Sequence, residues 1–125
     1  MQLNAQEIQN NWIDLEETIK TFIEEPRRSQ LLDFYHKYQE RIIMMPAAHK
    51  KEYHNAFPGG YVDHVLRVID CSLKLHNVWE EMGADISTYT KEELIFSALN
   101  HDLGKWEMIN MKHTFLRLIN GEEIN

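Results

Sequence analysis

Cysteine is almost absent from this chain of 125 residues, which contains only Cys71. A single cysteine excludes a disulfide framework within the chain and is typical of proteins from a reducing compartment. The sequence also has no apolar run of the roughly 18–20 residues that a membrane helix needs. Its first residues are polar and acidic, unlike the basic and then apolar order of a signal peptide. We therefore expect a cytoplasmic protein that does not associate with a membrane.

Basic residues are also scarce, because 13 Lys and Arg stand against 20 Asp and Glu and give a formal net charge of −7. A dedicated binder of long nucleic acid needs a basic face, so this class of protein is disfavoured. One or two basic side chains that lie close together are still enough to hold a small phosphorylated ligand. The expected partner is therefore a small phosphorylated molecule.

Strand-like alternation is scarce too, and helical spacing of apolar residues dominates. The length fits one domain. Pro26, Gly83 and Gly104 interrupt the pattern, and Thr90 with Glu93 forms a capping box at a helix start. The sequence predicts a single all-α domain of about five helices, over 5–24, 27–44, 60–82, 91 to the pair His101–Asp102, and 105–120.

The predicted helix over 60–82 is apolar on a wide face, which is typical of the central helix of a domain. This face includes Leu75, Val78, Trp79 and Met82. Cys71 lies within the same helix, and we interpret it as an inert small hydrophobic residue.

The segment PAAHKKEYHNAFPGG, residues 46–60, is predicted to be a loop because it holds two prolines and two adjacent glycines. It also contains His49, Tyr53, His54 and Phe57, so it is more aromatic than a plain spacer. A loop packed on the core and a loop that contributes to a site are both compatible with this composition.

Three polar residues stand in apolar helical surroundings: His64, His101 and Asp102. Burial of unpartnered imidazole and carboxylate groups is costly, and a shared cation would satisfy all three. Adjacent helix residues point about 100° apart, so the His101–Asp102 pair can flank one ion only in a crevice between helices. The short connection over 84–90 permits His64 to face the pair from an antiparallel helix. From the spacing alone, a metal site and ordinary core residues both remain open.

Two motifs in this region resemble those of a known family. FPGGYVDHVLRV, followed 37 residues after His64 by NHDLGK, resembles the HD superfamily of metal-dependent phosphohydrolases. The segment over 46–60 is similar to the lead-in of HD domains related to 3′–5′ exoribonucleases. The resemblance covers roughly residues 45–106 and implies an all-helical fold.

The resemblance also implies roles for individual residues. His64, His101 and Asp102 would be the ligands of one divalent metal ion, with Mn, Ni, Co, Zn, Fe and Mg as the candidates. Lys105 would lie near the substrate phosphate and act with Asp102 in catalysis. His54 matches a lead-in histidine that faces the substrate site.

The family pattern divides the chain into a helical hairpin over 1–45, an HD motif region over 46–106 and a short C-terminal segment over 107–125. The family's last metal-binding aspartate lies tens of residues beyond the HD pair, but no aspartate follows Asp102 here. The carboxylates that remain are Glu107, Glu122 and Glu123. We therefore expect an HD domain shortened at its C-terminus.

Two functions follow from this pattern. The first is a phosphohydrolase that acts on a nucleotide or short oligonucleotide phosphoester and is weakened by loss of the final aspartate. The alternative is a catalytically inactive HD module that binds a nucleotide or a protein partner. A shortened domain would also expose apolar helix faces, so we expect a homo-oligomer held together by the N-terminal or C-terminal helices.

Overall fold

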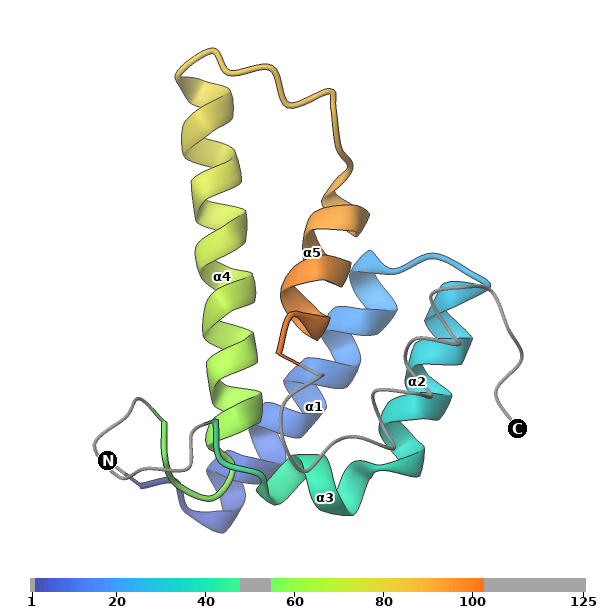
Figure 1. Cartoon of the computed structure of the whole chain (residues 1–125), viewed down its shortest axis with the longest axis vertical. Helices are drawn as coiled ribbons and strands as arrows, with labels where there is room; N and C mark the ends of the chain where they lie inside the picture. Colours follow the sequence, from blue (N-terminus) through green and yellow to red (C-terminus); the bar gives the residue numbers. More distant parts are fainter. Residues whose placement is uncertain (1, 48–54, 103–125) are drawn as a thin grey trace.

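The structure is a computed structural model that describes residues 2–47 and 55–102. Within these ranges the chain forms only α-helices and no strand, which confirms the predicted all-α class (Figure 1). None of these helices is long and apolar enough to cross a membrane. The predicted helix over 105–120 lies outside the described residues. The helices that the structure does describe are α1 (Ala5–Phe22), α2 (Arg27–Lys37), α3 (Gln39–Met44), α4 (Gly60–Glu81) and α5 (Lys91–Asn100).

The helix α1 begins with a capping box at Asn4. The Asn4 side chain accepts from the Glu7 N–H at 2.8 Å, and the Glu7 carboxylate accepts from the Asn4 N–H at 3.0 Å. These two bonds satisfy backbone donors that a helix start leaves unpaired. Trp12, Leu15 and Ile19 recur on one face and are buried, so α1 contributes one continuous stripe to the core.

The helix predicted over 27–44 is divided in two at Tyr38. The backbone of Tyr38 leaves the helical region, with φ −109° and ψ 16°, although its N–H still bonds to the Phe34 carbonyl at 3.3 Å. Phe34 from α2 and Ile42 from α3 are both fully buried. The turn at Tyr38 therefore lets two short helices each place an apolar side chain in the core.

The helices α4 and α5 lie side by side and run in opposite directions (Figure 1). Gly83, with φ +87°, follows the end of α4, and the predicted capping box of Thr90 and Glu93 opens α5. The Glu24 N–H donates to Glu92 at 2.8 Å, which ties the start of α5 to the segment after α1. The antiparallel arrangement brings the beginning of α4 next to the end of α5.

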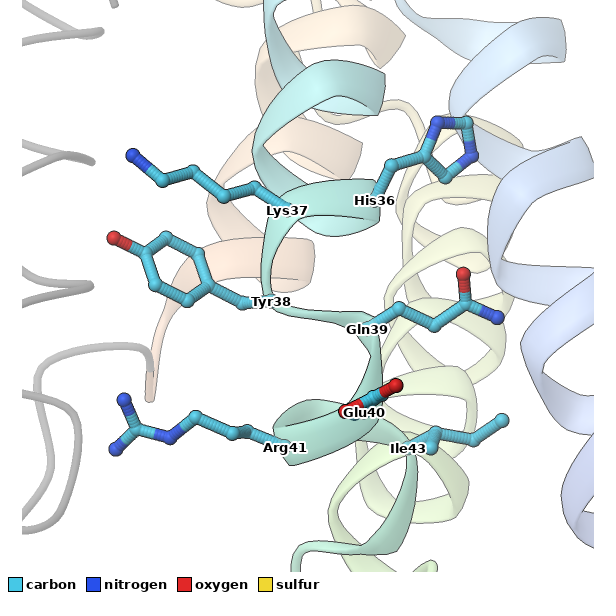
Figure 2. A pocket seen from close by; sticks show the side chains of 7 residues that line it. All are labelled: His36, Lys37, Tyr38, Gln39, Glu40, Arg41 and Ile43. Atoms are coloured by element: carbon cyan, nitrogen blue, oxygen red, sulfur yellow. The ribbon is translucent and has the colours of Figure 1, made fainter. Parts of the chain in front are cut away.

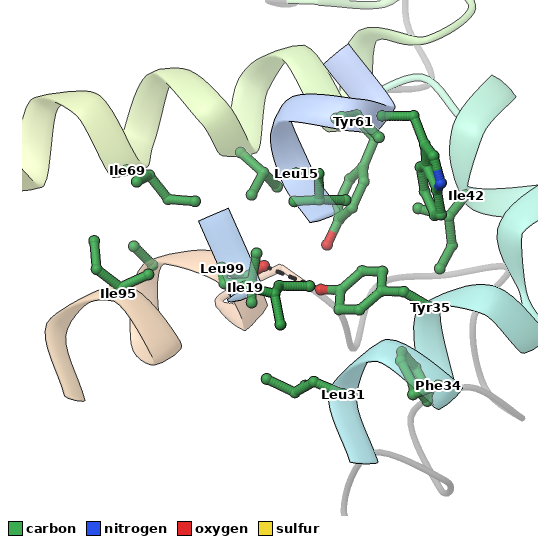
Figure 3. Close-up of a cluster of buried hydrophobic side chains, with 14 of the residues drawn as sticks. Leu15, Ile19, Leu31, Phe34, Tyr35, Ile42, Tyr61, Ile69, Ile95 and Leu99 are labelled. Carbon is green, nitrogen blue, oxygen red and sulfur yellow. Dashed lines mark hydrogen bonds between the residues drawn. The ribbon is translucent and has the colours of Figure 1, made fainter. Parts of the chain in front are cut away.

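The core lies where α1, α2, α4 and α5 meet (Figure 3). The buried core side chains that α4 contributes come from its N-terminal half. These are Tyr61, Val62, Val65 and Ile69, which are all buried. Leu73 of the C-terminal half packs against the core while partly buried.

The C-terminal half of α4 departs from the prediction of a central helix. Leu75, Val78, Trp79 and Met82 are 48%, 46%, 54% and 81% exposed, and Cys71 is exposed as well. The reason is one of length, because α4 has 22 residues and α5 has 10, so α4 extends past the helix that covers its first half (Figure 1). The prediction is therefore wrong for this half of the helix.

Candidate metal centre

A tight turn before α4 sets the position of His64. Asn55 has φ +58° and is buried, and its side-chain amide donates to the Gly60 carbonyl at 3.0 Å and to Asp63 at 2.9 Å. A Cβ atom on Gly60 would lie 2.2 Å from the Asn55 carbonyl oxygen, so no larger residue fits there. Gly59 has φ +81°, a conformation that glycine adopts without strain. This turn fixes the first turn of α4, and His64 lies on the next one.

The end of α5 is held from the other side of the core. Asn100 is buried, accepts from the Tyr35 hydroxyl at 2.8 Å and donates to the Phe96 carbonyl at 2.9 Å. Figure 3 shows Tyr35 reaching from α2 to the end of α5, where its hydroxyl also lies 3.4 Å from the Leu99 carbonyl oxygen. These bonds position the residue directly before the His101–Asp102 pair.

His101 caps α5, and its ring is oriented by the helix itself. Its Nδ1 lies 2.7 Å from the Ala98 carbonyl oxygen. A carbonyl can only accept, so Nδ1 carries the proton, and the Nε2 of a neutral ring then presents a lone pair. Metal-binding histidines commonly have this arrangement, in which the second ring nitrogen donates to a carbonyl or carboxylate.

The structure brings His64, His101 and Asp102 together. The Nε2 atoms of the two histidines are 3.3 Å apart, and the Asp102 Oδ2 lies 3.3 Å from the His64 Nε2 and 3.0 Å from the His101 Nε2. His64 therefore faces the His101–Asp102 pair from an antiparallel helix, as the short connection over 84–90 permits. The three residues offer one ligand atom each from a single compact group.

These separations fit one shared ion. Two atoms that each lie about 2.0–2.2 Å from an ion are roughly 2.8–3.1 Å apart at a right angle and roughly 3.3–3.6 Å apart at the tetrahedral angle. The three distances fall at these values. The side chains of His64, His101 and Asp102 are 24%, 34% and 20% exposed, so one side of the group faces solvent.

The chemistry of the group also favours a cation. With the proton of His101 on Nδ1, the Nε2 lone pair faces a carboxylate oxygen at 3.0 Å, and two such acceptors repel each other. A proton on His64 could be donated to only one of the two. A cation bound by all three atoms satisfies them together, so these residues fit a divalent metal ion.

Tyr61, one turn before His64, borders the group from the core. Burial raises the pKa of its hydroxyl well above the usual range, and the negative charge of Asp102 raises it further. Within the described part of the chain, this hydroxyl is buried without a hydrogen-bond partner. Tyr35 is also buried, and burial likewise raises its pKa.

Asn55, Tyr61 and Asn100 support the site but were not predicted from the sequence. The available signal was position, since Asn55 lies just before the Phe-Pro-Gly-Gly turn and Asn100 directly precedes the HD pair. The predicted substrate and catalytic residues His54 and Lys105 lie outside the described residues, as do Glu107, Glu122 and Glu123.

A separate pocket of about 690 Å³ lies at the junction of α2 and α3 (Figure 2). Lys37, Tyr38 and Arg41 extend to one side of this junction, and His36 and Gln39 to the other. None of the three residues of the candidate metal centre lines it. The candidate metal centre, where the start of α4 meets the end of α5, is thus separate from this pocket.

The chain is 31% identical over 84 residues to the 3′-5′ exoribonuclease YhaM of Oceanobacillus iheyensis. The match covers 66% of this chain and 24% of the relative, so the chain spans about a quarter of that protein's length. No family model matches the chain, and no solved structure matches it significantly. This similarity is distant and partial, and it supports the resemblance to HD domains related to 3′-5′ exoribonucleases.

Proposed function

We propose that this chain is an HD-type phosphohydrolase module that binds one divalent metal ion through His64, His101 and Asp102. Its proposed substrate is a phosphoester of a nucleotide or short oligonucleotide. The main support is the single group of three ligand atoms, 3.0–3.3 Å apart, at the crevice between α4 and α5. The similarity to a 3′-5′ exoribonuclease supports the substrate class.

The donor set narrows the choice of ion. Two neutral imidazoles and one carboxylate suit Mn, Fe, Co, Ni and Zn better than Mg, which prefers oxygen ligands. When bound, such an ion supplies a water molecule of lowered pKa and a positive charge beside a phosphoryl oxygen.

The residues of the proposed site each have a defined part. The Ala98 carbonyl holds the proton of His101 on Nδ1 and so keeps Nε2 available. Asp102 adds the one negative charge of the set. Lys105 would contact the substrate phosphate and His54 would face the substrate, as the resemblance implies.

Metal titration of the whole chain tests the ligand set. Thermal melts and calorimetry with Mn²⁺, Co²⁺, Ni²⁺, Zn²⁺ and Mg²⁺ should show binding and stabilisation by at least one ion. His64→Ala and Asp102→Ala should abolish both. His36→Ala is the matched control, because His36 is an exposed histidine paired with Glu16 at 2.8 Å and should leave binding unchanged. Melts that no ion moves would contradict the metal centre.

Hydrolysis is tested separately with a short RNA oligonucleotide and a panel of nucleotides, each with the ion that binds. Metal-dependent turnover that is lost in Asp102→Ala and reduced in Lys105→Ala supports the enzyme. Metal binding without turnover of any of these substrates would instead assign the alternative function, an HD module that binds its ligand without cleaving it.

A further inference from the structure

The projecting half of α4 carries a continuous apolar stripe. Leu75, Val78, Trp79 and the C-cap residue Met82 follow one another at spacings of three, one and three residues, so they lie on one face at the end of the helix. We call these four residues the α4 stripe. His76, on a different face, is the side chain that this half of α4 buries against the rest of the protein. The α4 stripe therefore points away from the contacts that α4 makes within the described chain.

Four large apolar side chains on one face are unusual for a protein surface and mark an interaction site. Trp79 adds to this, because tryptophan is enriched at the centres of protein interfaces. The stripe also belongs to a longer repeat. Leu75 and Met82 are seven residues apart, and so are Cys71 and Val78, while Val68, seven residues before Leu75, packs against the core of its own chain. This is the spacing of a coiled-coil seam, which requires a partner helix.

We propose that the partner is α4 of a second copy of this chain, packed antiparallel along the stripe. A twofold axis between positions 75 and 78 places Leu75 against Val78 of the second copy, and Cys71 against Met82 of the second copy. Each apolar contact then occurs twice, as a closed symmetric dimer requires. One sequence segment thus supplies both sides of the interface.

Charge at the edge of the seam favours the antiparallel direction. Lys74 and Glu81 flank the same edge, seven residues apart, and both are exposed. In the antiparallel pair, Lys74 of each copy lies opposite Glu81 of the other. In a parallel pair, identical residues stay at the same height and this match of opposite charges is lost. Lys74 also contacts Asp70 at 2.7 Å, an exposed pair that leaves the outer side of the ammonium group accessible.

The interface is small, because it is built from about three turns of one helix. Stable complexes bury about 800 Å² on each partner, and this surface is a fraction of that. The dimer should therefore have a dissociation constant in the micromolar range or weaker.

Sedimentation equilibrium of the whole chain between roughly 1 and 500 μM tests the proposal. The wild type should show a monomer–dimer equilibrium, and Leu75→Glu or Met82→Glu should weaken it at least tenfold. Met82 is 81% exposed, so its substitution does not disturb the core. The control is Ile13→Glu, which adds the same charge at an apolar residue of α1 with 46% exposure and should leave association unchanged. A monomer at every concentration, or a dimer broken by Ile13→Glu and not by Met82→Glu, would overturn the proposal.

A charge exchange tests the direction of packing. Lys74→Glu and Glu81→Lys should each weaken the dimer several-fold, and the double variant should restore it, because the opposite charges again face each other. A covalent probe gives an independent result. After oxidation with copper phenanthroline, Met82→Cys should form a disulfide between Cys71 of one copy and the introduced cysteine of the other. Cross-linking of Cys71 to Cys71 in the wild type at comparable yield would instead show parallel packing and overturn the proposal.

Discussion

The two halves of α4 have different surroundings in the described chain. The N-terminal half packs on α1 and α5, contributes four apolar side chains to the core and carries His64. The C-terminal half extends past α5 and exposes Leu75, Val78, Trp79 and Met82. Both halves have the same helical apolar periodicity. The difference shows that the neighbouring helix, and not the sequence pattern of α4, decides which part of it enters the core.

Each half of α4 also carries a histidine that contacts a residue next to α5. The two histidines differ in the groups that surround them. His76 is 4% exposed, its Nδ1 lies 2.9 Å from the Tyr89 hydroxyl and its Nε2 lies 3.8 Å from Glu80. A hydroxyl can both donate and accept, so this group is satisfied by its own members. The group around His64 places two ring nitrogens and a carboxylate oxygen 3.0–3.3 Å apart, an arrangement that one cation can share. The chemistry of the neighbouring groups, and not burial of the histidine, therefore distinguishes a candidate ligand from a structural residue.

The largest expected effect is a loss of folding stability, and it should differ between the two glycines at the ends of α4. Gly60→Ala should lower the free energy of unfolding by roughly 3 kcal/mol or more, because its Cβ would collide with the backbone oxygen of Asn55. Gly83→Ala should cost only about 1–2 kcal/mol, the strain of a positive φ, because an added Cβ there would meet no atom within 4 Å. Urea denaturation measures both values. Equal losses would show that the turn before α4 relaxes and does not fix His64.

The next prediction compares alanine substitutions of the two histidines, His76 and His64. His76→Ala should lower stability without metal by about 1–3 kcal/mol, because it leaves a buried cavity and removes the partner of Tyr89. It should retain the stabilisation by the ion, about 2.7 kcal/mol at a hundredfold excess over Kd. His64→Ala should do the reverse, with little change in the metal-free protein and no response to the ion. Melting curves of both variants with and without the ion measure this.

The response to the ion should also depend on pH. Histidine must be deprotonated to bind a metal, so the stabilisation of the wild type should shrink as the pH falls into the acidic range where histidines take up protons. The same melts, repeated from pH 8 to pH 5, measure the trend. A stabilisation that stays constant over this range would place the ion on carboxylates alone and exclude His64 and His101 as ligands.

Alkaline pH should destabilise the folded protein through two buried tyrosines, Tyr35 and Tyr61. The pKa values of Tyr35 and Tyr61 are raised, chiefly by burial, so both hydroxyls keep their protons in the folded protein. The unfolded chain releases these protons near pH 10, so stability is unaffected below that pH and falls as the pH rises above it. The expected slope is about 1.4 kcal/mol per pH unit for each tyrosine. Denaturation midpoints from pH 8 to pH 11 measure it, and a flat profile would show that the two hydroxyls ionise in the folded state.

The smallest effect is expected for Tyr61→Phe, and Tyr35→Phe provides the comparison. Tyr35→Phe should cost about 1–3 kcal/mol, because it leaves the buried Asn100 without its donor. Tyr61→Phe should be close to neutral or slightly stabilising, because it removes a buried hydroxyl that has no hydrogen-bond partner in the described chain. Urea midpoints of the two variants give the comparison. A larger loss for Tyr61→Phe would mean that its hydroxyl has a partner in the folded protein.

The sequence was sufficient for the features that depend on local chemistry. The capping box of Thr90 and Glu93 marks the start of α5, and the Gly-Gly pair and Gly83 bracket α4. The approach of His64 to Asp102 was compatible with the short connection over 84–90, which permits an antiparallel pair of helices. The all-α class followed from periodicity alone.

Features that depend on tertiary contacts were beyond the sequence. The break at Tyr38 follows from the burial of Phe34 and Ile42 together, which neither periodicity nor helix propensity reveals. The exposure of Trp79 follows from the length of a different helix. The ring orientation of His101 depends on the Ala98 carbonyl, whose position is set only when α5 has formed.

The bond between Tyr35 and Asn100 joins positions 65 residues apart. Closing so long a loop carries an entropic cost that only a nearly complete structure repays. The ligands beside Asn100 should therefore come together late, after the order of α2, α4 and α5 is established. If His64, His101 and Asp102 hold the proposed ion, an ion bound at that stage would slow unfolding and leave the folding rate nearly unchanged, because it would stabilise contacts that the transition state has not yet made. The proposed ion would then make the native state kinetically more stable.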